Sequence, residues 1–145
     1  METNVLRVLL ADDDEDDCLF FAEALAELAH SAQLTIVNNG EELTQLLLKQ
    51  TESLPDVLFL DMNMPRKSGY ECLVEIKTHK ILRELPVVVL STSFDQDMAD
   101  RFIRKGAFCC VQKPGNSGQL RAVIQNTLTR LAQESRHNHE PKNSI

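Results

Sequence analysis

The chain has 145 residues, of which 43% are hydrophobic and 26% are charged, and these values predict one globular domain with a buried core. The formal net charge of −7 argues against nonspecific nucleic-acid binding, which requires a basic surface, so we expect no direct DNA contact. The sequence contains neither an apolar stretch of transmembrane length nor an N-terminal signal peptide, so we expect a cytoplasmic protein without membrane contact. Its four cysteines lack CxxC spacing and are expected to be reduced residues of the core.

Short apolar runs alternate with segments in which apolar residues recur at helical spacing. Four of the five runs are almost continuously apolar, which is typical of parallel strands that are covered on both faces. The strict alternation predicts a doubly wound α/β fold with five parallel strands and right-handed crossovers. The predicted strands are residues 5–11, 34–37, 56–60, 87–90 and 108–112.

Turn and capping residues indicate where the predicted helices begin. Asn39 belongs to a turn before the second helix, and Asn116 belongs to a capping pattern that opens the last one. The C-terminal residues are mostly polar. We therefore expect a domain over residues 1–134 and a disordered tail over residues 135–145.

Six consecutive acidic residues, 12–17, follow directly on the first predicted strand. Clustered carboxylates repel one another, so Asp12 and Asp13 at the strand tip require a compensating cation, and oxygen ligands favour Mg²⁺ or a similar ion. The remaining acids, 14–17, are expected to lie in the first turn of the following helix, where the helix dipole favours negative charge. An acidic run alone is usually only solvated, so the metal hypothesis depends on residues elsewhere in the chain.

Polar residues also follow the other strands of the predicted sheet. Asp61 comes directly after the third strand, Ser91 follows the fourth, and Lys113 follows the fifth. Each of these residue types is common in loops. In a doubly wound sheet, however, ligands bind beyond the carboxyl ends of the strands. Together with Asp12 and Asp13, these residues therefore predict an active site at that edge.

The set of residues suits phosphoryl transfer to a carboxylate, with Asp61 as the candidate nucleophile. Mg²⁺ (or Mn²⁺) would be held by Asp13, Asp61 and the main-chain carbonyl of Asn63, with Asp12 binding through water. Lys113 would place a second positive charge on a phosphoryl oxygen. The hydroxyl group at the end of the fourth strand would donate a hydrogen bond to another phosphoryl oxygen.

Four motifs at the predicted strand ends carry a resemblance to a known family. They are Leu-Ala-Asp-Asp at residues 10–13, Leu-Asp-Met-Asn-Met-Pro at 60–65, Val-Val-Val-Leu-Ser at 87–91 and Val-Gln-Lys-Pro at 111–114. Together they resemble a CheY-like response-regulator receiver domain, and the resemblance covers nearly the whole chain. Within that family, the chain most resembles small single-domain regulators that accompany phytochrome-type kinases.

The resemblance implies the strand order 2-1-3-4-5 and a signalling phosphoacceptor, rather than an enzyme that acts on a separate substrate. Asp61 would accept a phosphoryl group from a sensor histidine kinase or a phosphotransfer protein, and its dephosphorylation would be self-catalysed. The signal would pass to an unknown downstream protein, and a homodimer through the fourth helix, fifth strand and fifth helix is plausible by resemblance. The resemblance also implies a cis peptide bond between Lys113 and Pro114.

Cys110 departs from the family pattern, because receiver domains usually have Tyr or Phe at this position. A thiol is too small to relay the motion of an aromatic ring, so we expect activation to proceed through loop repositioning or a changed dimer. Ser91 satisfies the family's switch position, and Asn63 and Ser93 match the positions that tune the lifetime of the phosphoryl group. Neither of these two residues is acidic, so we expect slow dephosphorylation.

Two other classes of function remain as alternatives. A phosphatase of the haloacid dehalogenase type also uses an aspartyl nucleophile and Mg²⁺. Its Asp-x-Asp motif follows the first strand, however, whereas here Asp61-x-Asn63 follows the third and lacks the second acid. A degenerate receiver would act only as an interaction module, although such a protein would be expected to lose Asp61 or Lys113.

Overall fold

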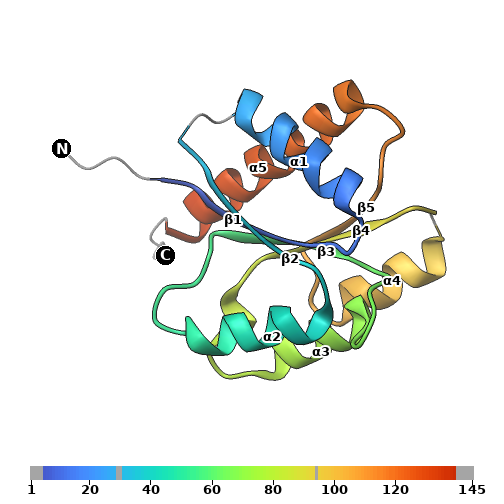
Figure 1. Ribbon diagram of the computed structural model, residues 1–145. Coiled ribbons are helices and arrows are strands. Elements are labelled where there is room, and N and C mark those ends of the chain that lie inside the picture. The colour runs from blue at the N-terminus through green and yellow to red at the C-terminus, as the bar shows by residue number, and fades with distance from the viewer. Residues whose placement is uncertain (1–4, 29–30, 94, 140–145) are drawn as a thin grey trace.

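A parallel sheet forms the centre of the computed structural model, which describes residues 5–28, 31–93 and 95–139. Its strands are β1 (Arg7–Ala11), β2 (Gln33–Val37), β3 (Val57–Asp61), β4 (Val87–Ser91) and β5 (Cys109–Gln112). Their spatial order is β2-β1-β3-β4-β5, and all neighbouring strands are parallel (Figure 1). This confirms the doubly wound fold and the strand order 2-1-3-4-5.

Helices cover both faces of the sheet. They are α1 (Glu15–Leu28), α2 (Gly40–Lys49), α3 (Gly69–Thr78), α4 (Gln96–Arg104) and α5 (Ser117–His139), with a short 3-10 helix η1 (Leu82–Glu84) before β4. Helices α1 and α5 lie on one face, and α2, α3 and α4 lie on the other (Figure 1). The carboxyl ends of the strands are therefore the edge at which loops from both layers meet.

Successive residues of the central strands point to opposite faces, so the sheet separates two apolar clusters. Leu9 and Leu58 pack with side chains of α2, α3 and α4. Val8 and Phe59 pack with side chains of α1 and α5. Strands β3 and β4 are buried at every position, which explains why their sequences are almost continuously apolar.

Side-chain caps begin the helices that follow β2, β3 and β5. The Asn39 side chain accepts a hydrogen bond from the backbone N–H of Glu42, and Ser68 forms a capping box at the start of α3. The Asn116 Oδ1 atom accepts from the Gln119 N–H at 2.8 Å, which confirms the predicted cap of the last helix.

Helix α5 extends further than the sequence suggested, because it ends at His139. Residues 135–139 of the predicted tail are thus helical as the last residues of α5, although only Arg136 among them is a good helix former. The last six residues, 140–145, lie outside the described part of the chain. Among the helices that the structure describes, none has the length and apolar character that a membrane crossing requires.

Candidate functional site

Three carboxylates meet at the carboxyl edge of the sheet. Asp12 and Asp13 follow β1, Asp61 ends β3, and the register of these two neighbouring strands brings the acids together. One oxygen atom from each carboxylate lies within 4.8 Å of the other two. Asp12 and Asp61 are buried and Asp13 is exposed. Three oxygen donors this close together, with one side open to solvent, fit a hard divalent cation.

The carboxyl group of Asp61 has an unusual protonation equilibrium. Burial and the negative charge of Asp12 raise its pKa to about 6, although Lys113 and a hydrogen bond from the Asn63 N–H act in the opposite direction. The Asn63 N–H lies 3.4 Å from Asp61 Oδ1. Asp61 is thus a carboxylate whose ionised form lacks full compensation, which favours both cation binding and attack on an electrophile.

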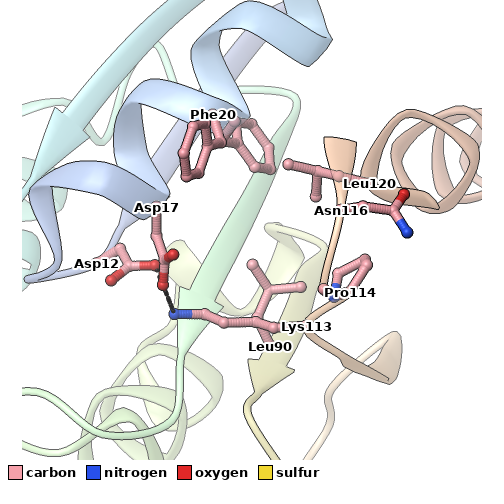
Figure 2. A pocket seen from close by; sticks show the side chains of 10 residues that line it. Asp12, Asp17, Phe20, Leu90, Lys113, Pro114, Asn116 and Leu120 are labelled. Carbon is pink, nitrogen blue, oxygen red and sulfur yellow. Dashed lines mark hydrogen bonds and ion pairs between the residues drawn. The ribbon is translucent and has the colours of Figure 1, made fainter. Parts of the chain in front are cut away.

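Lys113 supplies the positive charge of the site. Its Nζ atom donates to Asp12 Oδ2 at 2.8 Å and to Asp17 Oδ2 at 2.9 Å (Figure 2). The same atom lies 3.7 Å from Asp61 Oδ1. Burial acts to lower the pKa of Lys113, but the hydrogen bonds to Asp12 and Asp17 outweigh it, so the pKa is raised above its ordinary value. The ammonium group therefore stays charged at neutral pH.

Asp17 was not predicted as a site residue, since it was expected with its neighbours in the first turn of the following helix. It does lie in the first turn of α1, but its side chain is only 39% exposed and also pairs with Lys113. The buried residues Phe21 and Leu25 follow Asp17 at intervals of four. This spacing places Asp17 on the buried face of α1, and it is the sequence signal that could have identified the residue.

The hydroxyl group of Ser91 is engaged within its own loop. Ser91 Oγ donates to the carbonyl oxygen of Ser93 at 2.6 Å and accepts from the Ser93 N–H at 3.3 Å. Ser91 itself is buried at the end of β4, next to β3, whereas Ser93 and Asn63 are exposed. The structure thus brings Ser91 to the predicted edge, with its hydroxyl group bonded to the β4–α4 loop.

Cys110 lies away from the carboxylates, among residues of the α2–α4 layer. Its Sγ atom is 3.8 Å from the carbonyl oxygen of Ala99 in α4. The adjoining cavity, lined in part by Met98 and Phe102, measures only about 10 Å³. An aromatic ring could not enter this space without displacing its neighbours, so the packing around Cys110 agrees with the absence of a ring at this position.

The peptide bond between Lys113 and Pro114 differs from the expected cis form. None of the peptide bonds in the described residues is cis, so this bond is trans. The trans form is favoured by about 0.5–1 kcal/mol before proline, and local contacts readily decide the outcome. The Lys113 N–H still donates to the Ser91 carbonyl oxygen at 2.6 Å, which continues the pairing of β4 with β5 into the site.

Gly69 is a further residue that positions the site, and it was not among the site residues predicted from the sequence. Its N–H donates to the Met62 carbonyl oxygen at 3.0 Å. A Cβ atom at this position would lie 2.5 Å from the Asp61 carbonyl oxygen and 2.9 Å from the Met62 Cα atom. Glycine therefore allows the first turn of α3 to pack directly against the backbone that carries Asp61.

Residues 8–125 match the response regulator receiver domain family, and the chain belongs to this family. It is therefore a signalling protein of the two-component type. Receiver domains interact with histidine kinases or phosphotransfer proteins, and a buried carboxylate beside a lysine at the sheet edge is consistent with the phosphoacceptor role of this class.

Similar proteins identify the group within the family. The response regulator Rcp1 from Synechocystis sp. is 31% identical over 122 residues, which cover 81% of this chain and 83% of Rcp1. The crystal structure of the phosphorylated cyanobacterial phytochrome response regulator RcpA matches with 32% identity and a TM-score of 0.78, over 86% of this chain and 91% of RcpA. The crystal structure of Mn²⁺-bound Rcp1 matches with 30% identity and a TM-score of 0.73, over 83% of this chain and 89% of that one. These matches confirm the resemblance to regulators associated with phytochromes.

Proposed function

We propose that Asp61 is the phosphoacceptor of this receiver domain and takes a phosphoryl group from a sensor histidine kinase or a phosphotransfer protein. The observation that carries this proposal is the position of the Asp61 carboxylate, which is buried beside Asp12, Asp13 and Lys113. The nucleophile, a cation-binding acid cluster and a fixed ammonium group occupy one small region. Phosphoryl transfer requires such an arrangement of positioning and charge, with little further chemistry from the protein.

Mg²⁺ (or Mn²⁺) is the proposed cofactor, held by Asp13, Asp61 and the main-chain carbonyl of Asn63, with Asp12 binding through water. The close approach of the three carboxylates supports this assignment, and the related Rcp1 has a Mn²⁺-bound crystal structure. When it is bound, the cation would neutralise the carboxylates and the oxygens of the transferred phosphoryl group. Without that neutralisation, three acids would repel the phosphoryl donor.

The protein's own residues carry out the remaining steps. A carboxylate oxygen of Asp61 forms a bond to phosphorus while the bond from phosphorus to the donor atom breaks, and the donor keeps the electron pair. Lys113 Nζ, at 3.7 Å from Asp61 Oδ1, donates to an oxygen of the transferred group. The Ser91 hydroxyl exchanges its contact with Ser93 for another of these oxygens, and this exchange moves the β4–α4 loop toward the site.

We propose that this loop movement, rather than the rotation of a ring at Cys110, carries the signal to the surface formed by α4, β5 and α5. That surface would bind the downstream protein or a second copy of the chain, and Ile103 of α4, which is 45% exposed, is available for such contact. The proposed activity is limited to self-catalysed phosphorylation and dephosphorylation. The four free thiols support a location in the reducing cytoplasm.

Incubation with acetyl phosphate and Mg²⁺, followed by intact mass measurement, tests the proposal. We expect a single phosphoryl adduct on the wild-type chain and none on Asp61→Asn, which keeps the shape of the side chain but removes the nucleophile. Steady turnover of a phosphomonoester would instead identify a phosphatase. An absence of adduct under all conditions would identify an interaction module, and either result would contradict the proposed function.

The phosphoryl group is expected to be long-lived. Asn63 and Ser93 are both exposed beside the site, and neither side chain offers a carboxylate that could orient the hydrolytic water. After removal of excess acetyl phosphate, the adduct should persist for minutes when it is followed by intact mass. Its loss within seconds would contradict the expectation.

A further inference from the structure

The two close partners of Lys113 have different surroundings. Asp12 pairs with Lys113 and also belongs to the trio of carboxylates that could hold a cation, so a bound cation would place a second positive charge beside its oxygens. Asp17 is not a member of that trio. Its Oδ2 atom lies 2.9 Å from Lys113 Nζ, and the two side chains approach each other from the start of α1 and the end of β5 (Figure 2). Asp17 is thus the acid whose ion pair in this site is with Lys113 alone.

We infer that Asp17 is a positioning residue, which holds the Lys113 ammonium group in the orientation needed to bind the phosphoryl group on Asp61. This inference rests on the proposed function of Asp61. It adds a fourth acidic residue to the site, one that neither attacks phosphorus nor belongs to the carboxylate trio.

The geometry of the ammonium group supports this role. An ammonium group has three N–H bonds and no acceptor. Asp12 and Asp17 each accept one at hydrogen-bonding distance, while Asp61 lies at 3.7 Å. Two partners therefore use two of the three N–H bonds, and Asp61 is a third carboxylate within ion-pairing distance of the ammonium group. An unrestrained lysine side chain would lose more conformational freedom when it bound the phosphoryl group.

The surroundings of Asp17 and Lys113 show why a second hydrogen-bond acceptor helps to fix the ammonium group. A cavity of about 210 Å³ borders both Asp17 and Lys113, and its apolar wall includes Phe20, Pro114 and Leu120 (Figure 2). These three side chains offer the ammonium group no acceptor, and the Oδ1 atom of Asn116, which also lines the cavity, accepts from the Gln119 N–H. Asp12 and Asp17 are the acceptors that the Lys113 ammonium group has in the described part of the chain. If a bound cation also interacted with the Asp12 carboxylate, Asp17 would remain as the hydrogen-bond acceptor that keeps Lys113 in place.

Asp17 also adds a negative charge near an incoming anion, and this effect opposes its positioning role. Asp16 provides a matched control, because it is an exposed acid in the same first turn of α1. Asp16→Ala and Asp17→Ala remove the same charge, but only the latter removes the partner of Lys113. The ratio of their phosphorylation rates with acetyl phosphate therefore compares the two variants at the same net charge.

We expect Asp17→Ala to be phosphorylated roughly three- to tenfold more slowly than Asp16→Ala, a range typical for the loss of one charge-assisted hydrogen bond. Asp17→Glu, which keeps a carboxylate, should recover part of the rate. A second measurement needs no metal: the Lys113 ammonium protons, followed by ¹⁵N-edited NMR in EDTA, should exchange with solvent faster in Asp17→Ala than in wild type or Asp16→Ala.

Equal or faster phosphorylation of Asp17→Ala relative to Asp16→Ala would overturn the positioning role, and so would unchanged exchange of the Lys113 protons. Failure of the proposed function has a different signature, since the wild-type chain would then form no adduct at all. In that case the exchange measurement would still report whether Asp17 restrains Lys113.

Discussion

At the residue scale, the site combines acids that are useful in chemistry but unfavourable for folding. Asp61 is 6% exposed and lies beside Asp12, so its ionised form is poorly solvated and is repelled by a neighbouring charge. Lys113 compensates for this only in part, because its hydrogen bonds go to Asp12 and Asp17. The candidate nucleophile is therefore held in place by the stability of the rest of the fold.

The unfavourable burial of the ionised Asp61 carboxylate leads to a prediction about how the stability of the metal-free protein depends on pH. The pKa of Asp61 is about 6 in the folded chain against an ordinary 3.8, so the folded state binds more protons between these values. The free energy of unfolding should consequently fall as the pH rises through this window. Asp61→Asn should be more stable than wild type at pH 7.5 by on the order of 2 kcal/mol. The difference should disappear below about pH 4, where Asp61 is protonated in both states.

Urea denaturation in EDTA across this pH range provides the measurement. If Asp61→Asn were less stable than wild type at pH 7.5, the interaction with Lys113 would outweigh burial and repulsion. That result would contradict the direction of the pKa shift.

At the scale of elements, the start of α3 determines where the end of β3 lies. Ser68 caps α3, and Gly69 brings the helix close enough for its N–H to bind the Met62 carbonyl oxygen. Helix α4, which lies in the same layer as α3, contributes less, because the small cavity beside Cys110 leaves no room for a moving ring. Contacts between elements thus hold the acceptor backbone in place, whereas the β4–α4 loop is the part that we propose responds to phosphorylation.

Gly69→Ala tests the contact between α3 and the acceptor backbone. The new Cβ atom would lie 2.5 Å from the Asp61 carbonyl oxygen, so the helix or the strand end must shift. We expect a loss of about 1–3 kcal/mol in the free energy of unfolding. Phosphorylation by acetyl phosphate should also become slower, because the Asp61 carboxylate moves with its backbone.

Gly115→Ala is the matched control, since a Cβ atom there would meet nothing within 4 Å. Its free energy of unfolding should stay within about 0.5 kcal/mol of wild type. Urea denaturation of both variants makes the comparison, and equal stabilities would show that α3 accommodates the extra methyl group.

At the scale of the whole molecule, the sheet gathers acids and a lysine from positions 12 to 113 at one edge. The chain carries a net charge of −7, and the acid cluster concentrates part of it at this point. A cation bound there would link β1 with β3 in the folded state, and the unfolded chain has no such arrangement. Cation binding is therefore coupled to the stability of the entire domain.

Mg²⁺ should accordingly raise the thermal unfolding midpoint of the wild-type chain. The stabilisation is about 1.4 kcal/mol when the free ion exceeds its dissociation constant tenfold. Asp13→Asn should lose most of this effect, because it removes one of the three carboxylates. Asp16→Asn, which removes an equal charge outside the cluster, should retain it. Differential scanning calorimetry measures the change in the unfolding midpoint on addition of Mg²⁺. An equal change in both variants would indicate general charge screening instead of a specific site.

Much of the fold and part of the candidate site could be predicted from the sequence, because the signals involved are local. Continuous apolar runs identified strands that are buried on both faces, and their polar ends identified Asp61, Ser91 and Lys113 as residues of one edge. Asn116 was recognised as a cap because capping depends on residues three positions apart.

Contacts between distant segments decided the rest. The pairing of Asp17 with Lys113, the approach of Gly69 to the Asp61 backbone and the trans bond before Pro114 all depend on how separate elements pack. The acidic run after the first strand shows the difference between what local sequence signals predict and what tertiary contacts decide. Hydrophobic periodicity and charge placed these acids at the tip of a buried strand, since burial of apolar residues is encoded along the chain. Only the tertiary structure decided which of these acids lie close enough to share a cation, which pair with Lys113 and which remain exposed. The reason is that short-range electrostatics depends on distances that folding creates.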